Sequence, residues 1–220
     1  FKSFEWSWPL NRLTLEQIYK LHQHKTNLFP GGVLTIANNC SSWVKQVKVI
    51  SFSAPEDSTL DSLMWKMNSN VATEFIKTTD RPTILKHRYV ESGSNTRVFE
   101  YYDFSEIDLP AETSDAILSA ISKQVSAFDL VLAADYGHGF FSSKTISFLG
   151  ESNCNLSVNT QANAGNRGYN TISKYPRADF ITMNGAELQL ELRNRNPDYQ
   201  QIVPVLIASM KVKCAIVTLG

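Results

Sequence analysis

The segment 128–141, FDLVLAADYGHGFF, decides how the rest of the chain is interpreted. It is an apolar run that ends abruptly at Asp135 and continues into the glycine-containing stretch YGHG. The periodicity before it predicts a helix at about 113–126, and another helix is expected to begin near Ser142. A buried strand between two helices is the repeating unit of a parallel α/β sheet. We therefore expect Asp135 to lie at the carboxyl end of a strand, the edge where such sheets bind ligands.

The segments that follow continue this pattern. NLSVNT, ADFITMN and KCAIVTL are short runs typical of strands, and helices are expected at about 185–193 and in PDYQQIVPVLIASMK, interrupted or kinked at Pro204. This alternation predicts a mostly parallel sheet covered on both faces by helices. The residues expected at its carboxyl edge, besides Asp135, are Asn159, Gln161, Asn184, Thr218 and Gly220.

The N-terminal part is expected to lead into this sheet. LTLEQIYKLHQH has apolar residues at helical spacing and can be capped by Thr14. A Gly-Gly turn is then followed by a helix at 33–43, the strand VKVISF and a helix over 57–70.

Two polar motifs each allow two interpretations. In PGGVLTIANN, Gly31 and Gly32 would let a sugar approach the backbone and Asn38 would bond to its hydroxyls. The alternative is a plain turn into a helix. Asp135 would accept a hydrogen bond from a ligand hydroxyl, or it would instead satisfy backbone N–H groups in a tight turn.

The motif MNGAEL pairs Asn184 with Glu187. A carboxylate at this edge of the sheet would hold Mg²⁺ through water and so position phosphates. The alternative is a capping box, in which Asn184 caps a helix and Glu187 bonds back to the start of that helix.

The segment 71–104 differs from the rest of the chain. Two β-rich runs are separated by ESGSN, which predicts a hairpin that serves as a lid or a sheet extension. Lys86 and Arg88 are two residues apart, so they share one face of a strand. That face would receive a phosphate, or it would be a solvated charged face. Exposed strands of a lid could also pair with a second subunit.

Composition restricts the classes of function. The 220 residues carry a formal net charge of zero, which argues against nucleic acid or an anionic membrane as the main partner. No apolar run is long enough to span a bilayer, and the first residues lack the features of a signal peptide. Three separated cysteines indicate a reducing compartment. The histidines show no metal-ligand spacing, and no GxSxG nucleophile motif is present.

Taken in order, these motifs resemble the ribokinase/PfkB family of sugar kinases. Within that family they look most like the kinase domain of bifunctional heptose-phosphate kinase/adenylyltransferases (ADP-heptose synthase-like proteins). The segments that carry the resemblance are FPGGVLTIANN, RPTILKHRYV…TRVFEYYDF, VLAADYGHGFFS, ADFITMNGAEL and CAIVTLG. The resemblance implies a ribokinase-like three-layer α/β/α fold, a single domain over 1–220, with a small β hairpin or lid within 71–104. It also implies a cytoplasmic homodimer that transfers the γ-phosphoryl group of ATP to a sugar phosphate with Mg²⁺.

The resemblance also assigns residues to roles. Binding of the sugar phosphate falls to Gly31, Gly32, Asn38, Lys86, Arg88 and Asp135. Binding of the nucleotide falls to Asn159, Gln161, Asn184, Thr218 and Gly220. Glu187 is assigned to Mg²⁺, through water.

The departures from the family pattern concern catalysis. The family's catalytic aspartate lies in a Gly-Ala-Gly-Asp segment, which this sequence does not contain, and the Gly-Asp of the family's first strand is also not found. In VNTQANAGNRGYN, amides replace the charged residues of the heptose kinases. Transfer to a sugar hydroxyl needs a base and cations for the developing charge. We therefore assign no catalytic residue and expect the 220-residue chain, incomplete at both ends relative to the family, to be inactive as a kinase.

Three hypotheses follow from the sequence. The first is a truncated sugar-kinase domain from a longer protein that also carries a nucleotidyltransferase. The second is a non-catalytic module of the same fold that binds a sugar phosphate or drives assembly. The third is an unrelated α/β ligand-binding domain.

Overall fold

The computed structural model describes residues 2–6, 21–91, 93–103, 108–163, 166 and 168–219, with only the backbone for 2–6 and 21–25. These residues form two compact units. The first unit comprises most of residues 1–105, and the second comprises 106–220 together with the segments 50–52 and 73–80.

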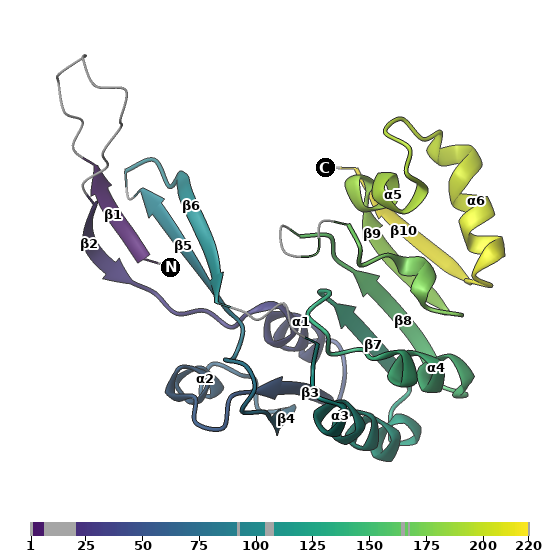
Figure 1. Ribbon diagram of the computed structural model, residues 1–220, viewed down its shortest axis with the longest axis horizontal. Helices are drawn as coiled ribbons and strands as arrows, with labels where there is room; N and C mark the ends of the chain where they lie inside the picture. Colours follow the sequence, from purple (N-terminus) through teal and green to yellow (C-terminus); the bar gives the residue numbers. More distant parts are fainter. Residues whose placement is uncertain are drawn as a thin grey trace. The chain divides into compact units, whose positions relative to one another are not determined.

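The second unit is built on a parallel sheet of four strands in the order β10-β9-β8-β7 (Figure 1). The strands are β7 (Leu130–Asp135), β8 (Asn155–Thr160), β9 (Phe180–Asn184) and β10 (Cys214–Thr218). The predicted parallel sheet is confirmed, and Asp135 is the last residue of its strand, as expected.

One helix precedes β7, and helices or a short 3₁₀ turn connect the strands that follow. The helices are α3 (Ala111–Gln124), α4 (Ser143–Glu151), α5 (Gly185–Leu192) and α6 (Tyr199–Ser209), with short 3₁₀ turns η1 (Val125–Ala127) and η2 (Ile172–Lys174). Side-chain caps start three of these helices, α4, α5 and α6. Ser142 accepts a hydrogen bond from the Thr145 N–H at 3.3 Å, and Asp198 accepts one from the Gln200 N–H at 3.0 Å. The helix α6 runs through Pro204, so the predicted interruption is not present.

One face of the parallel sheet is buried more completely than the other. Leu156 and Val158 on β8 are fully buried together with Leu149 of α4 and Leu188 of α5. On the opposite face, Leu130, Leu132, Phe180 and Ile216 are 40–55% exposed. The cause is topological, because successive right-handed connections between strands laid down in one direction all fall on the same side of the sheet.

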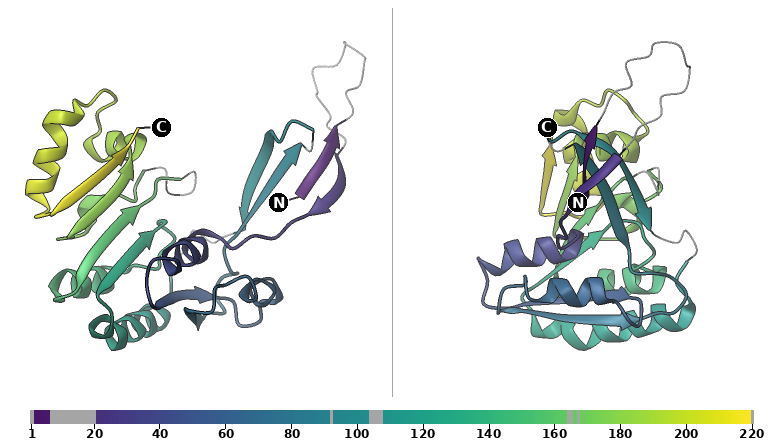
Figure 2. Two further views of the ribbon diagram at one scale, coloured as in Figure 1. Left: turned by 180° about the vertical axis from the view of Figure 1, so that it is seen from behind. Right: turned by 90° about the vertical axis from the view of Figure 1, so that its left-hand side faces the viewer.

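The first unit contains a mixed sheet of four strands in the order β2-β1-β5-β6 (Figure 2). The strands are β1 (Lys2–Trp6), β2 (Leu21–Thr26), β5 (Leu85–Glu91) and β6 (Arg97–Asp103). The prediction of a helix through LTLEQIYKLHQH is wrong for its last four residues, because Leu21–Thr26 pairs with β1 as an antiparallel strand. The rest of that segment, including Thr14, lies outside the described residues.

The hairpin β5–β6 forms where the sequence predicts it. Glu91 accepts hydrogen bonds from the N–H groups of Gly93 at 3.0 Å and Ser94 at 2.7 Å, and Asn95 adopts a left-handed φ of 55°. These local contacts fix the turn. The segment 71–77 does not belong to this hairpin, because β4 (Val71–Lys77) pairs with β3 (Val47–Ser53) in a separate sheet of two strands.

Two short helices complete the first unit. They are α1 (Gly32–Ser41), with Gly31 at its N-cap, and α2 (Ser58–Met64), which ends earlier than the predicted 57–70. Two large apolar side chains remain exposed near the ends of these helices, Trp43 at 89% and Trp65 at 77%. None of the described helices is long and apolar enough to cross a membrane.

Candidate functional site

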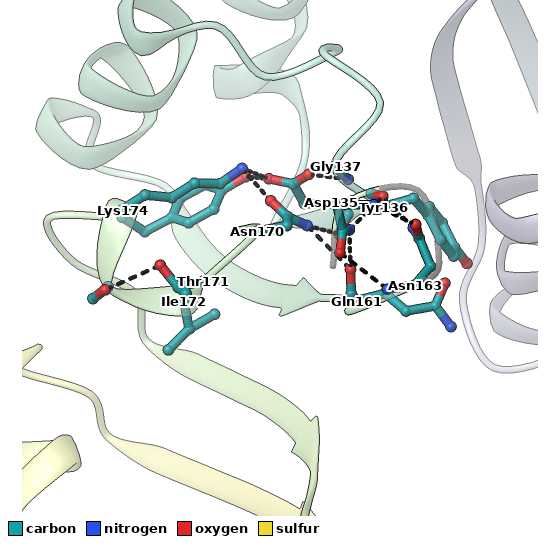
Figure 3. A network of polar contacts seen from close by, with 12 residues as sticks. Asp135, Tyr136, Gly137, Gln161, Asn163, Asn170, Thr171, Ile172 and Lys174 are labelled. Atoms are coloured by element: carbon teal, nitrogen blue, oxygen red, sulfur yellow. Dashed lines mark hydrogen bonds and ion pairs between the residues drawn. The ribbon is translucent and has the colours of Figure 1, made fainter. Parts of the chain in front are cut away.

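Asp135 lies at the centre of a polar network at the carboxyl edge of the parallel sheet (Figure 3). The side chain is 4% exposed. Its Oδ1 accepts the Gly137 N–H at 2.9 Å, and its Oδ2 accepts the Tyr175 hydroxyl at 2.7 Å and pairs with Lys174 Nζ at 2.5 Å. Both oxygens are therefore engaged within the protein. This geometry favours the second interpretation of Asp135, that it braces the turn after β7.

Tyr175 and Lys174 were not identified from the sequence. Burial, followed by the charge and the hydrogen bond of Asp135, raises the pKa of Tyr175 above its ordinary value. The phenol therefore stays protonated and acts as a donor to the carboxylate. A buried aspartate at the end of a strand requires partners of this kind, but the sequence does not show that they come from 40 residues downstream.

Position 137 requires a glycine because of its backbone conformation and its close neighbours. It has a φ of 71°, and a Cβ atom there would lie 2.6 Å from Asn166 Nδ2 and 2.9 Å from Asn170 Cβ. The space beside Gly137 is thus filled by the amide side chains of Asn166 and Asn170.

The segment 161–170 is cross-linked by its own amides. Asn163 and Asn166 accept each other's backbone N–H at 3.0 Å, and Asn163 Nδ2 donates to the Tyr136 carbonyl at 2.8 Å. Asn166 Nδ2 donates to the Gln161 carbonyl at 2.7 Å, and Asn170 Nδ2 donates to the Asp135 carbonyl at 2.8 Å. The amide-rich composition, seen in the sequence only as missing charge, is what fixes this loop to the end of β7.

The other residues predicted at the carboxyl edge of the sheet differ in whether their side chains bond within the protein. Asn159 Nδ2 donates to the Thr182 carbonyl at 2.8 Å and so links β8 to β9. Gln161 and Thr218 are exposed. Gly220 lies outside the described residues.

Asn184 and Glu187 form the capping box that the sequence allowed. Glu187 N–H donates to Asn184 Oδ1 and Asn184 N–H donates to Glu187 Oε2, both at 2.8 Å. Glu187 Oε1 also accepts the Ala162 N–H at 3.3 Å. One turn later on α5, Glu191 Oε2 accepts the Ile172 N–H at 2.8 Å. The two carboxylates of α5 therefore hold the two ends of the segment 162–172.

A small pocket lies between α5 and this segment. Its lining includes Thr160, Asn170, Thr171, Glu187 and Glu191. Its volume is about 10 Å³, which is room for one water molecule.

In the first unit, Gly31 and Gly32 form the start of α1, as expected. No atom lies within 4 Å of the position a Gly31 Cβ would occupy, so the backbone there is open. Asn38 is engaged differently. Its Nδ2 donates to the Lys66 carbonyl and its Oδ1 accepts the Asn68 N–H, both at 2.9 Å. Asn38 thus braces α1 against the turn before β4.

Lys86 and Arg88 share a face of the hairpin, as their spacing predicts. Lys86 Nζ lies 2.8 Å from Glu100 Oε1, and Arg88 Nε lies 3.0 Å from Glu100 Oε2. Lys86 Nζ also donates to the Tyr102 hydroxyl at 2.5 Å. Burial raises the pKa of Glu100, but the hydrogen bonds and charges of Lys86 and Arg88 outweigh it and leave this pKa below its ordinary value. Glu100 was not identified from the sequence, although the alternation of β6 could have placed it on this face.

The opposite face of the hairpin is aromatic. His87 stacks on Tyr101 with ring centroids 4.3 Å apart, and Tyr89 stacks on Phe99 at 4.1 Å. Phe99 and Tyr101 are 45% and 44% exposed. The hairpin therefore presents one charged side and one apolar side.

The fold is that of the ribokinase-like sugar kinases. Over its whole length the chain matches phosphofructokinase-2 from Escherichia coli in complex with fructose-6-phosphate, with a TM-score of 0.65 and 14% identity over 70% of that chain. It matches a possible 1-phosphofructokinase from Thermotoga maritima with a TM-score of 0.67 and 12% identity over 69% of that chain. A carbohydrate kinase from Agrobacterium tumefaciens matches with a TM-score of 0.60 and 15% identity over 66% of that chain. No protein-family model and no curated protein sequence matches the chain.

Proposed function

We propose that the chain is a sugar-kinase-type domain that binds a sugar phosphate and ATP. The observation that carries this proposal is that the whole chain, charged hairpin included, aligns with sugar kinases. An unrelated α/β ligand-binding domain does not account for that agreement.

The sugar phosphate would be bound by residues of two kinds. Lys86 and Arg88 supply positive charge on one face of the hairpin, and arginine suits the oxygens of a phosphate. Gly31 leaves the backbone at the start of α1 open to a polyhydroxylated ligand, and Gly32, the first residue of α1, adds no side chain there. Asn38 retains one donor and one acceptor position beyond its structural bonds. We propose that Asp135 does not contact the sugar phosphate and instead braces the turn after β7.

The nucleotide would lie along the carboxyl edge of the parallel sheet. The candidate residues are Asn159, Gln161, Asn184, Thr218 and Gly220. Among them, Gln161 and Thr218 are exposed and available to a ligand. Asn159 and Asn184 would contribute mainly by fixing the backbone, since both side chains already bond within the protein.

Glu187 fits Mg²⁺ through water rather than directly. Each of its oxygens accepts one backbone N–H and keeps a second lone pair for a metal-bound water. The described part of the chain contains no group of three or more His, Cys, Asp or Glu side chains that could hold a metal ion. When bound there, Mg²⁺ would neutralise phosphate charge.

We propose that the 220-residue chain binds these ligands without transferring phosphate, because it contains no Gly-Ala-Gly-Asp segment to supply the base. The test is to measure melting temperature and ATP turnover on the same preparation. We expect fructose 6-phosphate or a heptose phosphate to raise the melting temperature while ATP consumption stays at background. Turnover above background would contradict the catalytic part, and the absence of any shift with either sugar phosphate would contradict the binding part.

We further propose a heptose phosphate as the substrate and a bifunctional parent protein with an adenylyltransferase. These details rest on the resemblance of the five motifs to heptose-phosphate kinase/adenylyltransferases. The gene sequence on either side of the segment that encodes these 220 residues tests whether the parent protein is bifunctional. A Gly-x-Gly-Asp followed by a helix, and then a nucleotidyltransferase domain, would be expected downstream.

A second candidate function is a non-catalytic module that binds a sugar phosphate or drives assembly. The internal bonding of Asn163, Asn166 and Asn170 favours it, because these amides are used on the protein itself. Measuring the melting temperature during a titration with ATP and Mg²⁺ distinguishes the two functions. A module without nucleotide binding would show a shift with the sugar phosphate and none with ATP and Mg²⁺.

We also propose a homodimer formed through the hairpin. The aromatic side of β5 and β6 is exposed, and β6 is an edge strand of its sheet.

A further inference from the structure

The charged side of the hairpin holds one carboxylate between two cations. Glu100 lies directly opposite Arg88 in the register of β5 and β6, and Lys86 is opposite Tyr102. The carboxylate uses one oxygen for Lys86, at 2.8 Å, and the other for Arg88, at 3.0 Å. This is the arrangement by which two oxygens of a bound phosphate would bridge the same two cations.

We propose that Glu100 is a built-in counter-ion that stands in the place of the ligand's phosphate and must be displaced when the phosphate binds. The inference rests on the proposed function and adds a residue that sets ligand selectivity. The site would then accept phosphorylated sugars and reject neutral ones.

The exposure of the three side chains makes this exchange possible. Lys86, Arg88 and Glu100 are 28%, 32% and 34% exposed. Ion pairs in such positions contribute little to stability, because solvent screens them. Glu100 can therefore rotate away without a change in the backbone of the hairpin.

Charge decides which ligand displaces it. A phosphate brings up to two negative charges and three acceptor oxygens, against the single charge of the carboxylate. A neutral sugar hydroxyl brings no charge that could replace that of the carboxylate. Like charges close together on one face of a sheet repel each other, so exchange of the carboxylate for an anion is favoured over exchange for a neutral ligand.

Tyr102 keeps the site in shape during the exchange. Lys86 Nζ donates to its hydroxyl at 2.5 Å and lies 4.5 Å from the centre of its ring. Lys86 therefore remains directed toward this face of the hairpin when the carboxylate leaves.

The test is calorimetric titration of the 220-residue chain and its variants with fructose 6-phosphate and with fructose. Glu100→Gln keeps the shape of the side chain and removes its charge. We expect it to bind fructose 6-phosphate about 3- to 10-fold more tightly than the wild type, the range that one or two weak ion pairs support. Wild-type protein should show no binding of fructose at the same concentrations.

The matched control is Glu56→Gln. Glu56 is also exposed and belongs to the first unit, so its replacement changes the net charge equally. It should leave the affinity unchanged. Equal tightening in both variants would mean that only the net charge matters, and the inference would be wrong.

Two further variants keep this inference separable from the proposed function. Arg88→Gln should weaken binding of fructose 6-phosphate at least 5-fold. If it does so while Glu100→Gln does not tighten binding, Glu100 is not a competitor and the phosphate site still stands. If Arg88→Gln has no effect, the phosphate site itself is wrong.

Should Glu100→Gln prove unfolded by circular dichroism, Glu100→Asp replaces it, and its shorter carboxylate should give a smaller tightening.

Discussion

Asp135 shows how a residue can be placed from the sequence while its role depends on distant partners. The apolar run before it put it at the end of a strand, which is where it lies. Its ion pair with Lys174 and its hydrogen bond from Tyr175 were not predictable, because both partners follow a loop whose path the sequence does not reveal. A buried carboxylate with these partners is a structural brace.

Replacing Asp135 with Asn should therefore lower stability and leave ligand affinity unchanged. Lys174 would lose its ion pair and keep its hydrogen bond to Asn170 Oδ1, and breaking a largely buried pair from one side costs about 2–3 kcal/mol, allowing for the partial exposure of Lys174. Urea unfolding measures this loss. Asp115→Asn is the control, because its pair with Lys144 is exposed and its replacement should cost less than about 0.5 kcal/mol. Equal losses in the two variants, or weakened sugar-phosphate binding in the Asp135 variant, would contradict the bracing role.

Asp179 gives the chain a measurable response to acid. Burial raises the pKa of Asp179, but hydrogen bonds from Lys213, the Leu156 N–H and Arg177, together with the charge of Arg177, outweigh it and lower this pKa from 3.8 to about 2. A lowered carboxyl pKa stabilises the folded state above the unfolded pKa, and the contribution is lost as pH falls. The window is therefore about pH 4 to pH 2.

Unfolding free energy should fall by about 1 kcal/mol through that window on account of Asp179, after allowance for solvent screening. Asp179→Asn should be less stable than the wild type at pH 7, with a difference that shrinks toward pH 2. Urea unfolding at several pH values measures both. A difference that is constant with pH would show that the charge of Asp179 is not the cause.

At the scale of elements, the sequence located the strands and most helices of the second unit because periodicity and caps agree there. It failed at residues 21–26, where the pattern of LTLEQIYKLHQH favours a helix but pairing with β1 gives a strand. Local propensity is a weak prior that tertiary contacts override. It also did not reveal that Glu187 and Glu191 of α5 hold the segment 162–172, since the donors to their carboxylates are backbone N–H groups outside that helix.

Replacing Glu187 with Ala should loosen one end of that segment. The N–H groups of Asn184 and Ala162 would both lose an acceptor, at a cost of about 1 kcal/mol. Hydrogen exchange of the Ala162 amide should become faster. Glu112→Ala is the matched control, since Glu112 also lies in the first turn of a helix but is exposed. Unchanged exchange at Ala162 in the Glu187 variant would show that the contact does not restrain the segment.

At the scale of the whole molecule, the sequence predicted the fold class and the comparisons with solved sugar kinases confirm it. Five motifs in a fixed order carried that prediction, although each is weak alone. The motifs could not show which side chains are already bonded to other residues of the protein. Lys86 and Arg88 share a face as predicted, yet only the structure shows that Glu100 already pairs with both.

The aromatic side of the hairpin gives a prediction about assembly. The wild-type chain should be a dimer by light scattering coupled to gel filtration, and Phe99→Lys or Tyr101→Lys should shift it to monomer, because a buried lysine at the interface would be unpaired. Trp43→Lys is the control, since Trp43 is also exposed in the first unit but lies outside the hairpin. A monomeric wild-type chain would rule out this interface.

The exposure of Trp43 and Trp65, two of the four tryptophans, limits what the fluorescence of these two residues can report about folding. Both indoles already face water in the folded state, at 89% and 77% exposure. Their fluorescence emission should therefore change little in wavelength when denaturant unfolds the protein. Near-ultraviolet circular dichroism of buried Tyr175 would report on the packed interior instead.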